Sequence, residues 1–65
     1  MTQYVVVFHE PIYESEIFLQ ASDDKDAKSK ASRLYRHFRQ RKGVTIHKAT
    51  LYVDAVGPAN KVCDL

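Results

Sequence analysis

Apolar residues in the first third of the chain follow patterns that predict two strands. Residues 4–8 are five consecutive apolar side chains, rich in β-branched and aromatic types, which is typical of a strand over residues 3–9 that is buried on both faces. In residues 16–21 the apolar side chains Ile17, Leu19 and Ala21 occupy every second position and predict a second strand. The short link between the two runs contains Pro11, so a β-hairpin is the expected connection.

A helical pattern follows the second strand. Residues 22–24 (Ser-Asp-Asp) can accept hydrogen bonds from the free N–H groups of a first helical turn, so they indicate a helix start. From there to about Lys42 the apolar residues recur at three- and four-residue steps and share one face, which holds Ala27, Ala31, Leu34, Tyr35 and Phe38. Gly43 is well placed to end the helix in a left-handed conformation.

Residues 44–53 predict a third strand. The alternation begins with Val44 and Ile46 and resumes at Ala49, so we expect a bulge near Lys48. Residues 55–65 show little pattern and are expected to form a loose tail after a single domain over residues 1–54. A right-handed crossover makes the second and third strands parallel. The predicted fold is therefore α+β, in the order β-β-α-β, with a three-stranded antiparallel-type sheet (order 2-1-3) and one helix packed on one face.

The composition indicates the size of the core and the cellular compartment more clearly than it indicates the function. A chain of 65 residues can form one small core, and Cys63, its single cysteine, cannot form an internal disulfide. The start of the chain lacks the longer apolar region of a signal peptide, and no run approaches the length of a membrane span. We therefore expect a cytoplasmic protein without a membrane partner.

Positive charge is concentrated in the predicted helix. The net charge is only +2, yet eight of the ten Lys and Arg residues lie between Lys25 and Lys42. On a helix, the side opposite the apolar stripe would carry Lys25, Lys28, Arg33, Arg36 and Arg39, while Lys30, Arg41 and Lys42 would flank the stripe. Such a face can dock on an acidic protein surface, follow the phosphates of a nucleic acid, or simply be solvated.

The sheet offers a second candidate surface, because one helix can cover only one of its faces. Val5, Val7 and Phe18 are the residues expected on the uncovered face. That face could pack against a second copy in a homodimer, or an open edge strand could join a partner's sheet. A few exposed apolar residues are also normal, and the tail could cover them. Strand aromatics could stack on bases of a nucleic acid, for which Tyr4, Phe8, Phe18 and Tyr52 are available.

Residues with catalytic chemistry are scattered. His9, His37 and His47 have no neighbours at the spacing of zinc ligands, and Cys63 has no sequence sign of an activating base. The chain contains no phosphate loop, nucleophile elbow or paired-carboxylate motif. We therefore predict no catalytic residue, no metal site and no cofactor, and expect that the protein is not an enzyme.

The stretch from Ala21 to Tyr35 resembles the small inhibitors of host RNA polymerase made by T7-type phages. The shared residues are Ala21, the pair Asp26-Ala27, Ala31, Tyr35, and Gly43 ahead of the last predicted strand. That family is similar in length and in its β-β-α-β order. The resemblance implies a phage-encoded regulator that binds and inhibits a host protein complex. The alternatives from the residues themselves are a nucleic-acid-binding accessory protein and a homodimeric structural module.

Overall fold

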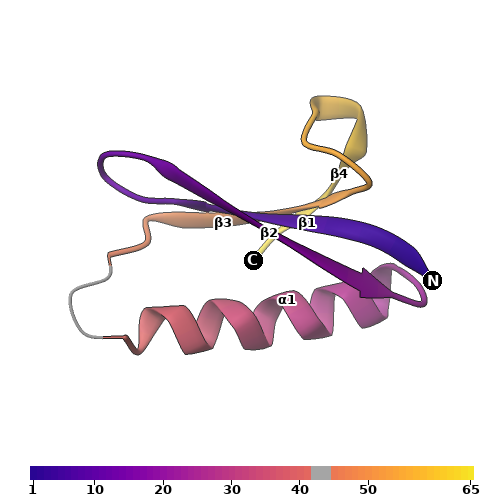
Figure 1. Ribbon diagram of the computed structural model, residues 1–65, viewed down its shortest axis with the longest axis horizontal. Coiled ribbons are helices and arrows are strands. Elements are labelled where there is room, and N and C mark those ends of the chain that lie inside the picture. Colours follow the sequence, from indigo (N-terminus) through magenta and orange to yellow (C-terminus); the bar gives the residue numbers. More distant parts are fainter. Residues whose placement is uncertain (42–44) are drawn as a thin grey trace.

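The computed structural model describes residues 1–41 and 45–65, and Figure 1 shows a single sheet with a helix along one face. The elements follow one another as β1 (Thr2–His9), β2 (Glu14–Ala21), α1 (Asp24–Arg39), β3 (Lys48–Val53), the short 3-10 helix η1 (Pro58–Asn60) and β4 (Lys61–Asp64). Every strand pair is antiparallel, and the order across the sheet is β2-β1-β3-β4. The α+β class and the central position of β1 are confirmed.

The expectation of a three-stranded sheet is wrong, because β4 adds a fourth strand beside β3. The chain reverses after β3 through Asp54, whose φ of 71° is in the left-handed region. The turn is then held by Asn60, whose side-chain Nδ2 donates to the Ala55 carbonyl at 3.0 Å. Beyond β4, the Leu65 N–H still donates to the Ala49 carbonyl at 2.9 Å. The expectation of a loose tail is therefore wrong for residues 58–64, which form a short 3-10 helix and a sheet strand.

The boundaries of β3 and α1 also differ from the expected ones. Strand β3 begins at Lys48, and from there its register with β1 is continuous. Just before it, the His47 N–H donates at 2.8 Å to the carbonyl of His9, the residue in register with Lys48. Two consecutive residues thus face His9, which is typical of the bulge expected near Lys48. The β3–β4 pair has a further irregularity, between Leu51 and Tyr52. Helix α1 ends at Arg39. The N–H of the next residue, Gln40, is shared between the carbonyls of Arg36 and His37 in the last turn. Residues 42–44, including the expected terminator Gly43, lie outside the described residues.

The core lies between the sheet and α1. Its buried residues alternate along the strands on the helix side and are Tyr4, Val6, Phe8, Ala21, Ala27, Ala31, Ala49 and Leu51. The helix contributes two alanines to this set, and side chains this short let its backbone approach the sheet closely. The Phe8 ring packs against two aromatic rings of α1, with centroids 6.0 Å from Tyr35 and 5.2 Å from Phe38. The outer side of α1 is therefore free of any role in the core.

Candidate binding surfaces

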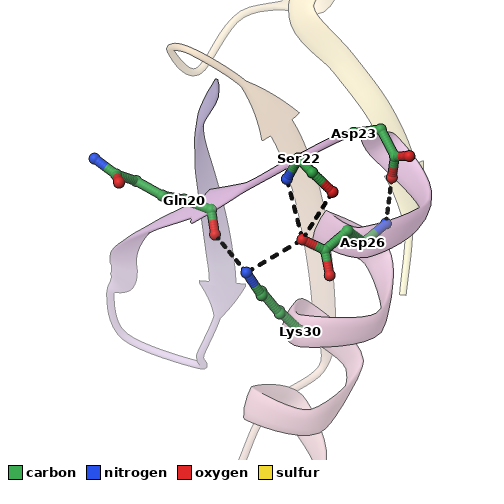
Figure 2. Close-up of polar contacts among 5 residues, drawn as sticks. All are labelled: Gln20, Ser22, Asp23, Asp26 and Lys30. Atoms are coloured by element: carbon green, nitrogen blue, oxygen red, sulfur yellow. Dashed lines mark hydrogen bonds and ion pairs between the residues drawn. The ribbon is translucent and has the colours of Figure 1, made fainter. Parts of the chain in front are cut away.

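A polar network fixes the start of α1 against the edge strand β2 (Figure 2). The N-cap residue is Asp23, whose carboxylate accepts from the Asp26 N–H at 2.8 Å. The Asp26 Oδ2 in turn accepts from the Ser22 N–H at 3.0 Å and forms an ion pair with Lys30 at 3.2 Å. Lys30 Nζ also donates to the Gln20 carbonyl of β2 at 2.9 Å.

This network stabilises the ionised form of Asp26. The Ser22 backbone N–H, followed by Lys30, lowers the pKa of Asp26 below its ordinary value. Lys30 is paired with this acid at four-residue spacing. Lys30 consequently links α1 to β2, and its charge is balanced locally by Asp26.

The five cations predicted for the outer helix face all lie on α1 and are all exposed: Lys25, Lys28, Arg33, Arg36 and Arg39. We call this set the basic helix face. Within residues 1–41 and 45–65, none of the five forms an ion pair with a carboxylate. The Arg39 guanidinium stacks 5.3 Å from the centroid of the Tyr35 ring. The face thus presents uncompensated positive charge on a rigid helix.

A groove runs between β2 and α1 at the border of the basic helix face. It has a volume of about 380 Å³ and is lined by Leu19 of β2 together with Lys30, Arg33, Leu34 and His37 of α1. Leu19 and Leu34 are half-buried and pack against the core, so they supply its apolar surface. Each of these side chains could be assigned to its strand or helix from the sequence alone. The groove could not be predicted, because it depends on the placement of α1 beside β2.

The sheet face opposite α1 is less accessible than we expect from the sequence. Val5, Val7 and Phe18 do point away from α1, yet Val5 is 0% and Val7 is 1% exposed, whereas Phe18 is 58% exposed. In register, Val5 lies between Phe18 on β2 and Tyr52 on β3, whose larger side chains extend beyond it. The expectation that a partner can contact Val5 and Val7 is therefore wrong, and Phe18 is the accessible member of the set.

Charged groups border this opposite face. The Asp64 carboxylate lies 3.2 Å from Lys61 Nζ and 3.7 Å from Lys48 Nζ, and Thr50 Oγ1 donates to it at 3.2 Å. The hydrogen bond from Lys61, with the charge of Lys48, lowers the pKa of Asp64. His9 Nδ1 and a Glu14 carboxylate oxygen are 3.5 Å apart at the other end of the face. These charged groups make the opposite sheet face more polar than an apolar homodimer interface.

The aromatic residues considered for base stacking are separated by the sheet. Tyr4 and Phe8 are each 2% exposed and belong to the core beneath α1. The Tyr4 hydroxyl donates to the Asp24 carboxylate at 2.6 Å, which raises the pKa of Tyr4 to about 12. Phe18 and Tyr52 lie on the other face, away from the basic helix face. A combined surface of stacked aromatics and helix cations is therefore not formed.

The hairpin tip exposes apolar residues that sequence reasoning treated only as a connection. Ile12 is 92% and Tyr13 is 62% exposed. The Glu10 N–H donates to the Tyr13 carbonyl at 3.0 Å, and Ser15 Oγ donates to the Glu10 carboxylate at 2.8 Å. The signal available in the sequence was an Ile-Tyr pair between Pro11 and Glu14, which carries no periodicity.

Other chemistry is sparse in the described part of the chain. Over residues 1–41 and 45–65, no three His, Cys, Asp or Glu side chains come together as metal ligands could. Cys63 is half-buried in β4 and packs against the core. Over the same residues, no helix has the length and apolar character needed to cross a bilayer.

Comparison of the chain with protein-family models, with curated proteins and with solved structures found no significant match.

Proposed function

We propose that this protein is a small non-catalytic regulator that docks on the acidic surface of a protein partner through the basic helix face. The observation that supports the proposal is the set of five exposed cations on α1, none of which has a carboxylate partner in the described part of the chain. Complementary charge of this kind steers a partner toward one orientation and accelerates association. Unneutralised charge that contributes nothing to the core is what an electrostatic docking surface needs.

The class of action, inhibition of a host protein complex, is supported by the resemblance to T7-type inhibitors. Of the residues that carry it, Asp26 and Ala27 lie in the first turn of α1, and Ala21 ends β2. Ala31 and Tyr35 lie further along α1 and pack in or against the core. These residues shape the helix start and core, and none of them belongs to the basic helix face. The fourth strand departs from the β-β-α-β order of that family. The resemblance therefore supports a kind of function without assigning contact residues.

A matched pair of variants tests the docking face. The double substitution Lys28→Gln with Arg36→Gln neutralises two exposed residues that have no side-chain partner in the described structure. The control, Lys48→Gln with Lys61→Gln, removes the same two charges from the opposite face, where both pair with Asp64. Each variant lowers the net charge from +2 to zero. The two variants lose the same charge from different faces, and the control in addition loses the ion pairs with Asp64.

The readout is capture of a protein from nuclease-treated host lysate in stoichiometric amount. We expect wild type and the Lys48/Lys61 control to recover the same protein and the Lys28/Arg36 variant to lose it. Recovery of no protein at all, or equal recovery by both variants, would overturn the proposal.

The nucleic-acid alternative predicts a different response. Binding to nucleic acid would weaken steeply with salt and would be lost on charge reversal at Arg33, Arg36 and Arg39. A flat salt response would remove this alternative.

A further inference from the structure

We propose that the outer edge of β2 and the adjoining groove form a second binding site, which accepts an extended peptide with an acidic residue on its helix side. This site goes beyond the basic helix face, because its main elements are the β2 backbone and the apolar groove residues Leu19 and Leu34. The two surfaces share Arg33 alone. Peptides of this type add themselves to open sheet edges as an extra strand.

The ladder geometry shows which backbone groups of β2 are open. On the β3 side, the carbonyls of Gln3 and His9 accept from the Asp54 and His47 N–H groups, each at 2.8 Å. Odd-numbered residues of β1 thus direct their backbone groups to β3, and their partners on β2 direct theirs away from β1. These outward-facing residues are Glu14, Glu16, Phe18 and Gln20.

Protection of this edge is incomplete. The one outward carbonyl with a recorded partner in the described structure is that of Gln20, which accepts from Lys30. The β1–β2 register is continuous, and β2 contains no proline, so neither a bulge nor a missing donor blocks addition of a strand. The outward N–H and C=O groups from Glu14 to Phe18 are available to a new strand.

The charges on the two sides of β2 determine which side chains an added strand should carry on each of its faces. Its helix-side residues would lie over the groove, whose apolar surface is Leu19 and Leu34. The border of the groove carries Arg33, a cation without a carboxylate partner among residues 1–41 and 45–65. On the other side, its residues would stand beside Glu14 and Glu16, which are exposed. Cross-strand pairs favour opposite charges. The matching peptide is therefore acidic and apolar toward the helix and basic toward the opposite face.

A designed peptide tests this pattern directly. The capped sequence Thr-Val-Lys-Glu-Lys-Val-Thr places two valines and the glutamate on one side of a strand and both lysines on the other. Since it reads the same in both directions, strand orientation does not alter the charge pattern. The inverted control, Thr-Val-Glu-Lys-Glu-Val-Thr, exchanges the two charged sets. A second control keeps the first sequence but carries N-methyl groups at Lys, Glu and Lys, which removes the central backbone donors.

Titration of isotope-labelled protein, followed by amide chemical shifts, measures binding at the edge. We expect shifts along β2 with the first peptide, a loss of affinity of at least about tenfold with the inverted peptide, and no binding of the N-methylated peptide. The variant Glu16→Pro should abolish binding while the fold persists, because the Glu16 N–H points outward and is not used in the ladder. Glu16→Ala controls for the lost charge, and Arg33→Gln should weaken binding.

Three results would overturn the proposal. One is equal affinity for the charge-inverted peptide, and another is undiminished binding of the N-methylated peptide. The third is a sedimentation profile in which the protein alone is a dimer that Glu16→Pro converts to a monomer, since a second copy would then occupy the edge. The basic helix face is unaffected by any of these results, because the Lys28/Arg36 test alters neither β2 nor the groove.

Discussion

Leu51 offers the most direct test of the core that β4 completes. Its side chain is 0% exposed, and it lies in register between Val6 of β1 and Cys63 of β4. Truncating a fully buried leucine to alanine costs about 3–4 kcal/mol through lost burial and the cavity left behind. A chain of 65 residues has a total stability of roughly 3–10 kcal/mol. The Leu51→Ala substitution should therefore remove a large part of the free energy of unfolding.

Urea unfolding followed by circular dichroism measures this loss. We expect a lower midpoint with an unchanged slope, and a thermal midpoint lower by roughly 15–25 °C. The matched control is Leu19→Ala on the edge strand β2, where the leucine is only half-buried and faces the groove. Its cost should be about half that of Leu51→Ala, since less apolar area leaves water there.

The comparison depends on β4. Were residues 61–65 a loose tail, β3 would be an edge strand and Leu51 would be as accessible as Leu19. Equal costs for the two leucines, or a loss below about 1.5 kcal/mol for Leu51→Ala, would refute the packing described above.

Three further predictions concern polar contacts. Asp23→Ala removes the N-cap of α1 and should cost about 1 kcal/mol of unfolding free energy in urea titrations, whereas Asp23→Asn should cost far less. Folding lowers the pKa values of Asp26 and Asp64, so their contribution to stability is present above the ordinary carboxyl pKa and is lost as pH falls through the lowered values. Urea midpoints should therefore drop below about pH 4, and the drop should be smaller in Asp26→Asn. The pKa of Tyr4, about 12 in the folded protein, should fall toward its ordinary value in Asp24→Asn when phenol absorbance is titrated, because the hydrogen bond to that carboxylate is the main cause of the rise.

Periodicity predicted the elements that are long enough to show it. Strands β1 and β2 and helix α1 each span at least eight residues, so the continuous apolar run of β1, the alternation of β2 and the three- and four-residue steps of α1 were visible. Strand β4 has four residues, of which Val62 and Cys63 are the apolar pair. Four residues cannot establish an alternation, and the pairing that makes β4 a strand is with distant β3. Periodicity therefore could not predict β4, because this strand is defined by its tertiary pairing.

The candidate surfaces were predictable only in part, for a similar reason. Exposure of the basic helix face followed from its position opposite the apolar stripe, which is a local property of the sequence. The burial of Val5 depends on Phe18 and Tyr52, which reach it only through strand register. The groove between Leu19 and Leu34 depends on where α1 lies across the sheet. Properties set by the relative placement of elements require the folded structure.

The most direct test of the account is a map of where the captured partner contacts the protein. Amide shifts of the isotope-labelled protein would be recorded with and without that partner. We expect the largest changes to follow α1 from Lys25 to Arg39 and to be lost in the Lys28/Arg36 variant. Changes confined to the opposite face, around Phe18, Lys48 and Tyr52, would contradict it.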